Sequence, residues 1–280
     1  MGYKLVCIDM DGTLLDDKKE VSKENLEAVK KVTEMGVKVA VCTGRLFTSA
    51  KFYANLLGVK TPIISSNGAY IREKDKNKVI YQSNLGEENC KEILSIVTKF
   101  KINVFFNTPR GVISLKPFDK NNTYIKMNET LPEGDRIEII EAANIEEEIK
   151  KYKDDIVKCI CIEQDFEEIS AAKNEISKLG KYEVVSSGRD NFEIMCKGVS
   201  KGRAAKVLAD YYNIDSKDVI CIGDNENDLS MIQFAGMGVV MGNGDEHVKT
   251  FANYITDTNN NSGVAKALQE LIINANHSNN

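Results

Sequence analysis

Three short apolar runs, each followed at once by polar residues, constrain the fold of this 280-residue chain most strongly. They are residues 4–8 (KLVCI), 37–42 (VKVAVC) and 219–222 (VICI). Continuous apolar runs of this length are typical of strands that are buried on both faces. Helix-like segments separate the runs, so the sequence predicts an α/β fold with a doubly wound, parallel, Rossmann-like sheet.

The helix signals between these runs fit the same architecture. Ser22 stands where it can cap a helix that stops at Gly36, and a second helix over residues 46–57 ends at Gly58. Another apolar strand is expected at residues 62–65. The alternation returns at the end of the chain, with helices expected at residues 201–212, 228–235 and 264–273 and strands at 219–222 and 238–241.

The middle of the chain follows a different pattern. Strand-like runs at residues 104–107 and 111–116 flank Pro109-Arg110, which indicates a hairpin. Strands grouped with helices on one side are typical of an α+β module. We therefore expect a core domain formed by residues 1–83 and 187–280, and an inserted domain formed by residues 84–186.

Two clusters of acids follow apolar runs. Asp9 and Asp11 lie in DMDGT, and the second cluster is GDNEND at residues 223–228. Open parallel sheets bind ligands beyond the carboxyl ends of their strands, and carboxylates held together there need a counter-charge. Oxygen-only ligands suit Mg²⁺ better than zinc. A turn in the first cluster and an acidic helix start in the second are the simpler alternatives.

Other polar residues at expected helix starts point to an anion. Thr43 and Gly44 offer a hydroxyl and backbone N–H groups to a phosphate, although Thr43 as a simple helix cap is the commoner arrangement. Lys201 also begins a helix, where the helix dipole disfavours a cation. A lysine in this place indicates an anionic partner, although most lysines are only solvated.

These segments, in their order along the chain, resemble the four motifs of the haloacid dehalogenase (HAD) superfamily. The motifs are DMDGT at 9–13, TGR at 43–45, Lys201 in GVSKG, and GDNEND at 223–228. GVSKG and GDNEND resemble the Cof-type branch, and the insertion resembles the C2 cap domain of that branch. The resemblance covers essentially the whole chain. It implies a Mg²⁺-dependent phosphatase of small phosphorylated metabolites, such as sugar phosphates or phosphorylated cofactors.

The resemblance also implies the catalytic roles. Asp9 would attack phosphorus and become an aspartyl phosphate. Asp11 would protonate the leaving oxygen and later activate water. Asp9, Asp224 and the backbone carbonyl of Asp11 would be the Mg²⁺ ligands. The phosphoryl oxygens would be held by the N–H of Met10 and by Thr43, Gly44, Lys201 and Asn227, with Asp228 positioning Lys201 or the metal shell from behind.

Alternatives stay open at this point. A phosphomutase would use Asp9 on the same fold, whereas a phospho-accepting receiver domain is about half this length and lacks an inserted cap. A non-catalytic binding protein would gain nothing from an attacking carboxylate. Arg45 and Asn67 are second-rank site candidates near the expected sheet edge, and the acidic run at residues 146–148 is expected to be a solvated helix face.

Composition limits partners and location. A formal net charge of −5 without a basic tract disfavours nucleic-acid binding. No apolar run approaches the roughly 20 residues that span a membrane, and the first residues do not fit a signal peptide. We therefore expect a cytoplasmic protein whose partner is a small phosphorylated metabolite. The sequence does not indicate an oligomeric state.

Overall fold

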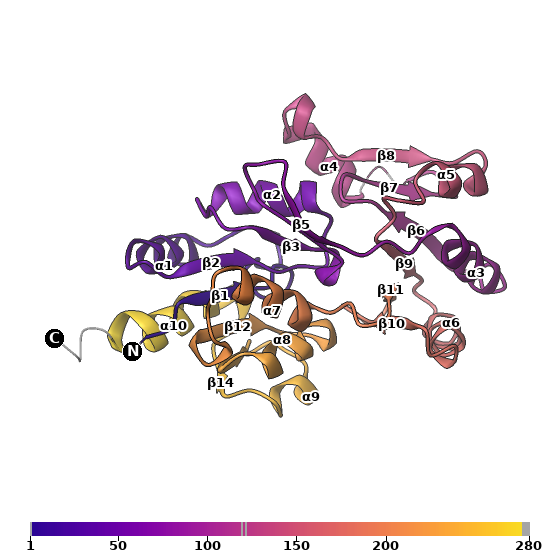
Figure 1. Cartoon of the computed structure of the whole chain (residues 1–280). Helices are drawn as coiled ribbons and strands as arrows, with labels where there is room; N and C mark the ends of the chain where they lie inside the picture. Colours follow the sequence, from indigo (N-terminus) through magenta and orange to yellow (C-terminus); the bar gives the residue numbers. More distant parts are fainter. Residues whose placement is uncertain (1, 119, 121, 276–280) are drawn as a thin grey trace.

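The computed structural model describes residues 2–118, 120 and 122–275. Figure 1 shows two bodies: one is built from the first and last thirds of the chain, and the other from its middle third. We call the first the core and the second the cap. This agrees with the expected α/β fold with an inserted module.

The core is built on a five-stranded parallel sheet. Its strand order is β14 (Tyr254–Ile255), β13 (Met237–Val240), β12 (Val219–Gly223), β1 (Leu5–Ile8) and β2 (Lys38–Val41). β1 lies between β12 and β2, with Ile8 opposite both Ile222 and Val41. The two strands that precede the acidic clusters are therefore neighbours.

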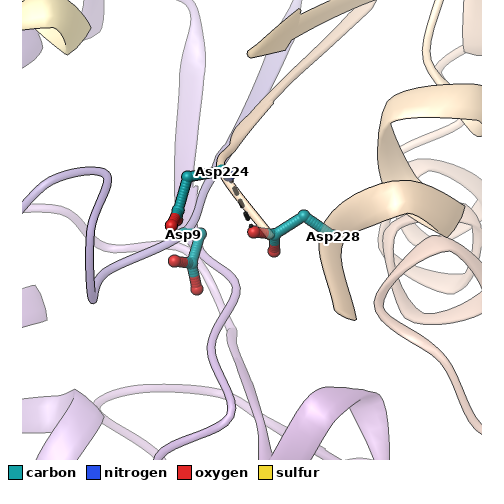
Figure 2. Close-up of side chains that lie close together, drawn as sticks. All are labelled: Asp9, Asp224 and Asp228. Atoms are coloured by element: carbon teal, nitrogen blue, oxygen red, sulfur yellow. Dashed lines mark hydrogen bonds between the residues drawn. The ribbon is translucent and has the colours of Figure 1, made fainter. Parts of the chain in front are cut away.

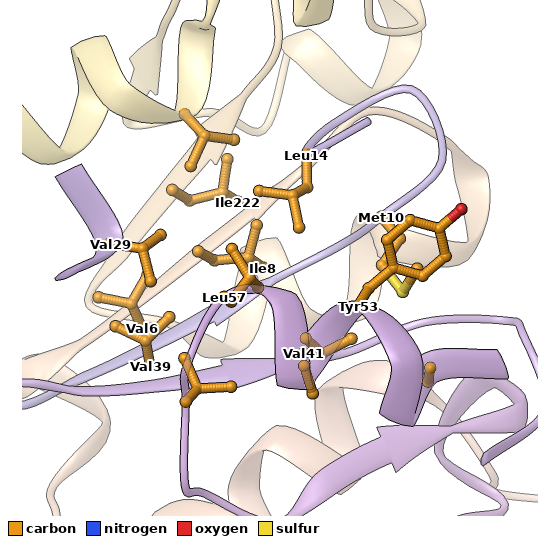
Figure 3. Packing of buried hydrophobic residues seen from close by; sticks show 14 of the residues in the cluster. Val6, Ile8, Met10, Leu14, Val29, Val39, Val41, Tyr53, Leu57 and Ile222 are labelled. Carbon is orange, nitrogen blue, oxygen red and sulfur yellow. The ribbon is translucent and has the colours of Figure 1, made fainter. Parts of the chain in front are cut away.

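Helices cover both faces of this sheet, which explains why its inner strands β1, β12 and β13 are apolar. Val6 and Ile8 pack in a cluster with α1 (Lys23–Glu34), α2 (Phe47–Leu56) and α10 (Gly263–Leu268), as Figure 3 shows in part. The alternate strand residues Leu5 and Cys7 pack on the other face, against α7 (Lys201–Tyr211) and α8 (Leu229–Phe234). The Ser22 hydroxyl accepts a hydrogen bond from the N–H of Asn25 and caps α1, as expected.

A small antiparallel sheet extends the core beyond β2. It consists of β3 (Ile63–Ser65), β4 (Tyr70–Arg72) and β5 (Val79–Gln82), and a single parallel bridge between Cys42 and Ile64 joins it to the end of β2. β3 was expected from the sequence, whereas β4 and β5 were not. The turn between β3 and β4 contains Ser66 and Asn67, both with positive φ, of 50° and 54°.

The cap is a six-stranded sheet with helices on one face. Its strand order is β10 (Tyr182–Val185), β11 (Asn191–Cys196), β9 (Lys158–Ile162), β6 (Asn103–Asn107), β7 (Gly111–Ser114) and β8 (Glu138–Glu141). The expected hairpin is confirmed, because β6 and β7 pair antiparallel around Pro109-Arg110. The helices α3 (Glu87–Val97), α5 (Ile145–Lys151) and α6 (Phe166–Lys178) share one buried apolar cluster with the sheet.

One strand lies on the other side of the expected domain boundary. The division at residue 186 would leave β11 in the core, but β11 pairs with β9 and β10 of the cap sheet. The apolar pattern of β11 is interrupted by Glu193, so the sequence did not indicate a strand there. We therefore propose that the cap extends to Cys196 and that the core resumes after it.

Shorter elements complete the described residues. α4 (Thr123–Thr130) leaves the cap and packs through Met127 on the apolar cluster of the core. The terminal helix α10 continues as a π-helix, Gln269–Asn274. The others are α9 (Glu246–Lys249) and the 3₁₀ turns Ser66–Gly68, Glu133–Asp135, Ser216–Asp218, Glu226–Asp228 and Asn259–Asn261. Among the residues described, no helix has the length and apolar character to cross a membrane.

Candidate active site

The two acidic clusters meet at the carboxyl ends of β1 and β12. Figure 2 shows the side chains of Asp9, Asp224 and Asp228 grouped at this edge, and one carboxylate oxygen of each lies within 4.8 Å of the others. All three residues are buried. Gly12, with φ of 83°, makes this approach possible, because a Cβ there would lie 2.5 Å from Asp224 Oδ2.

Lys201 lies between two of these acids. Its ammonium group is 2.6 Å from Asp9 Oδ1 and 2.6 Å from Asp228 Oδ1, and the residue is 0% exposed. Burial alone would lower the pKa of Lys201, but Asp228 and Asp9 outweigh it and raise that pKa well above its ordinary value. The sequence predicts an anionic partner for a lysine at a helix start. Within the protein, the partners of Lys201 are these two carboxylates.

Asp228 holds Lys201 from behind and also organises its own loop. Its Oδ2 accepts hydrogen bonds from the N–H groups of Asp224 and Asn225, at 2.9 and 3.1 Å. Asn225 caps the turn Glu226–Asp228 in return. Asp228 and Asn225 therefore stabilise a helix start, as the simpler interpretation of GDNEND expects, and Asp228 also contacts Lys201 in the acidic cluster.

The charge balance and the ligand atoms of this cluster fit a divalent cation. Three buried carboxylates face one ammonium group. Burial first, and then the negative charge of Asp228, raises the pKa of Asp224 to about 7 and that of Asp9 well above its ordinary value. A hard cation with oxygen ligands would supply the missing positive charge. Thr13 Oγ1 donates to Asp224 Oδ1 at 2.8 Å and orients that carboxylate.

Asp11 points to a different set of partners. Arg45 donates to both of its carboxylate oxygens, and Lys19 Nζ is 2.9 Å from Oδ1. Burial would raise the pKa of Asp11, but Arg45 and Lys19 outweigh burial and hold that pKa well below its usual range. The Asp11 side chain lies outside the group of acids that could hold a metal, so only its backbone carbonyl stays a proposed ligand.

The expected phosphate-binding residues lie around the same edge. Thr43 is not the cap of α2, because Leu46 occupies that position and Thr43 Oγ1 instead accepts from the N–H of Arg45 at 3.1 Å. The Asn227 amide donates to Asn67 Oδ1 at 3.2 Å. The Met10 side chain is buried in the core cluster, which leaves its backbone as the only part suited to a ligand.

A cavity of about 500 Å³ lies above this edge, between core and cap. On the core side it is lined by Asp9, Asp11, Lys19, Thr43, Gly44, Arg45, Asn225 and Asn227. On the cap side the cavity wall includes the sheet face opposite α3, α5 and α6, with residues such as Phe105, Asn107 and Ile160. The cap thus covers the acidic cluster with a wall that is partly apolar and partly amide-bearing.

Lys158 and Glu193 are among the residues of the cavity that the sequence did not indicate. Both are buried on cap strands, and together they form an ion pair beside Gly44 and Asn67. The signal that could have revealed them is a charged residue within an otherwise apolar strand. The second-rank candidates Arg45 and Asn67 both lie at the site, where Arg45 lines the cavity.

Comparisons with known proteins extend over both bodies of the chain. A family model described as haloacid dehalogenase-like hydrolase matches residues 6–268. YxeH of Bacillus subtilis (strain 168) is 34% identical over 280 residues, which cover 97% of this chain and 99% of YxeH. YwtE of the same organism, named 5-amino-6-(5-phospho-D-ribitylamino)uracil phosphatase, is 30% identical over 294 residues, with 96% and 98% covered. A solved haloacid dehalogenase-like hydrolase from B. subtilis has 28% identity and a TM-score of 0.83, covering 96% of this chain and all of that one.

Proposed function

This chain belongs to the haloacid dehalogenase-like hydrolases, and from that premise we propose a phosphatase of small metabolites that uses Asp9 as a covalent nucleophile. The observation that carries the proposal is the placement of Lys201 between Asp9 and Asp228 beneath the cavity. An attacking carboxylate needs positive charge beside it, because phosphate esters are themselves anionic. Lys201 supplies part of that charge at the reacting atom.

In the first step, an Asp9 oxygen forms a bond to phosphorus while the bond between phosphorus and the leaving oxygen breaks. Asp11, which becomes protonated when its contact with Arg45 gives way to one with the substrate, donates that proton to the leaving oxygen. In the second step, water attacks phosphorus, Asp11 takes the proton from this water, and inorganic phosphate leaves Asp9. Asp11 lines the same cavity as Asp9, which supports these two roles.

The phosphoryl oxygens are proposed to bind to the Thr43 hydroxyl, the Lys201 ammonium, the Asn227 amide and the N–H groups of Met10 and Gly44. Donors fixed in advance around a transferring phosphoryl group stabilise its transition-state charge without reorganising. In the structure, Thr43, Gly44 and Asn227 line the cavity that Asp9 also lines. This lining supports the assignment of these three residues, and the 2.6 Å contact of Lys201 with Asp9 supports that of the ammonium group.

Mg²⁺ is the proposed cofactor, held by Asp9, Asp224 and the backbone carbonyl of Asp11. The all-oxygen donor set and the excess of buried carboxylates support it. When bound, the ion would add positive charge next to the phosphoryl oxygens. Asp228 is proposed to act only through Lys201 and the 224–225 backbone, because both of its oxygens are engaged there.

The proposed partner is a small phosphorylated metabolite, such as a sugar phosphate or a phosphorylated cofactor. The cavity volume of about 500 Å³ suits a molecule of that size. We expect no nucleic-acid or membrane partner, since the chain carries a formal net charge of −5 and has no basic tract. A cytoplasmic location stays a prediction.

A phosphate-release screen over small phosphorylated metabolites tests the proposal, with Mg²⁺ in one arm and a chelator in the other. We expect inorganic phosphate in stoichiometric amounts with Mg²⁺ and none with chelator. Conversion of a sugar phosphate to its isomer without free phosphate would instead favour a phosphomutase. Activity that persists in the chelator would contradict the metal assignment.

A further inference from the structure

The inner face of the cap sheet carries a buried ion pair directly above the core. Lys158 begins β9 and Glu193 lies in the adjacent strand β11, and each residue is 2% exposed. Their side chains point away from the cap helices, since the alternate residues Cys159, Phe192 and Ile194 fill the apolar cluster on that side. Nothing in the mechanism above requires these two charges.

Both members of the pair reach across to the core. The Lys158 ammonium donates to the backbone carbonyl of Gly44 at 2.6 Å and also to Glu193. Glu193 Oε2 accepts from the Asn67 amide at 2.8 Å. Asn67 Oδ1 in turn accepts from Asn227 at 3.2 Å. One cap ion pair thus connects to Gly44 and Asn227, which are both proposed phosphate ligands.

The space around these contacts leaves little freedom. A Cβ on Gly44 would lie 2.9 Å from Asn67 Oδ1 and 3.5 Å from both carboxylate oxygens of Glu193. Asn67 has a positive φ of 54°, and its N–H donates to the carbonyl of Thr43 at 3.0 Å. The loops that carry Thr43, Gly44 and Asn67 are therefore held together. The ion pair of the cap adds hydrogen bonds to Gly44 and Asn67 from the other side of the cavity.

We propose that Lys158 and Glu193 are positioning residues that complete the phosphate-binding loops only when the cap covers the core. The inference rests on the proposed phosphatase function. A buried ion pair is costly to desolvate and is stable only where its remaining hydrogen bonds are made. Gly44 and Asn67 of the core supply some of those bonds, so cap closure and the geometry of the phosphate site are coupled. The pair is neutral overall and leaves the charge at Asp9 unchanged.

The test compares Lys158→Met, Glu193→Gln and the double variant with wild type. We expect each single variant to lose about 10- to 100-fold in kcat/KM, mainly in kcat, since a displacement of about 1 Å in a site can cost that much. Inhibition by orthovanadate with Mg²⁺, which mimics the transferring phosphoryl group, should weaken in parallel. The double variant should lose less than the product of the two single losses, because neither charge is left unpaired.

The choice of substrate separates positioning from recognition of the leaving group. If the pair acts through Gly44 and Asn67, the fold-loss is the same for p-nitrophenyl phosphate and for a sugar phosphate. Lys99→Met and Glu175→Gln are the matched controls, because this cap pair is exposed and lies 3.6 Å apart on α6 and beyond the end of α3. Both controls should keep wild-type kinetics.

Full activity in the double variant would overturn the inference, and so would a loss confined to one substrate. A measurement on wild type decides the matter if the variants do not fold. Mg²⁺ and orthovanadate should raise hydrogen-exchange protection in β9 and β11 as well as in residues 43–45 and 66–68, and unchanged exchange in both strands contradicts the coupling. A wild-type protein that releases no phosphate refutes the proposed function itself.

Discussion

Arg45 holds both carboxylate oxygens of Asp11, with Nε 2.6 Å from Oδ2 and Nη2 2.8 Å from Oδ1. Such a bidentate pair is among the stronger side-chain contacts, and it favours the ionised carboxylate. The proposed acid/base is therefore held in its basic form while the cap covers the core. To protonate a leaving group, Asp11 must exchange this contact for one to the substrate.

Asp11→Asn should discriminate between leaving groups. The amide cannot give a proton, and general acid catalysis contributes about 10²- to 10⁴-fold. We expect a loss of that size in kcat/KM for a sugar phosphate and a loss at least about tenfold smaller for p-nitrophenyl phosphate, whose leaving group departs without a proton. Steady-state kinetics with both substrates measures this. Equal losses would show that Asp11 does not act as the acid.

Lys201→Met should abolish activity and destabilise the core. It leaves Asp9 and Asp228 buried without their counter-charge, and breaking such a pair costs about 3–5 kcal/mol. The matched control is Lys206→Met on the same helix, where the ammonium is exposed and pairs with Asp210 at 2.7 Å. Thermal unfolding should show a lower Tm only for the first variant. A wild-type Tm and rate in Lys201→Met would refute the role of the buried ammonium.

Asp224→Asn should raise the Tm of the metal-free protein at pH 8. The pKa of Asp224 is about 7 in the folded chain, above that of an unfolded carboxyl, so its ionisation opposes folding. This unfavourable contribution to the free energy of folding is fully present above pH 7. It declines by about 1.4 kcal/mol for each pH unit below that. The advantage of the variant should therefore shrink from pH 8 to pH 5 in thermal scans with chelator.

The effect of Mg²⁺ on the Tm of the same two proteins tests the proposed metal ligand. A ligand that binds only the folded state raises its stability, so Mg²⁺ should raise the Tm of wild type. Asp224→Asn removes one proposed ligand and should respond much less at the same concentration. An equal response of the two proteins would place the ion elsewhere.

Much of the core and of the site could be predicted from the sequence, because local patterns encode them. The apolar run 37–42 has to be a strand with two buried faces, and Ser22 is a direct helix-start signal. Acids at the ends of two such strands have to meet if the strands are neighbours, and the pairing of Ile8 with Ile222 makes them so.

The cap contacts could not be predicted, since they depend on pairing between distant segments. Glu193 breaks the apolar pattern of its own strand, and only the register of β11 with β9 places it beside Lys158. The strand β5 could not be predicted either, because Val79 is exposed and its neighbours are only partly buried. Whether the cap reaches Gly44 depends on how the two bodies pack, which no local pattern specifies.

The central claim is that Asp9 carries the phosphoryl group, and chemical trapping tests it most directly. Wild-type protein would be incubated with Mg²⁺ and substrate, quenched in acid, reduced with borohydride and analysed by peptide mass spectrometry. A phosphorylated aspartate is reduced to homoserine, so we predict homoserine at position 9 and none in Asp9→Asn, which should fold but release no phosphate. Homoserine at another position, or wild-type turnover by Asp9→Asn, would contradict the account.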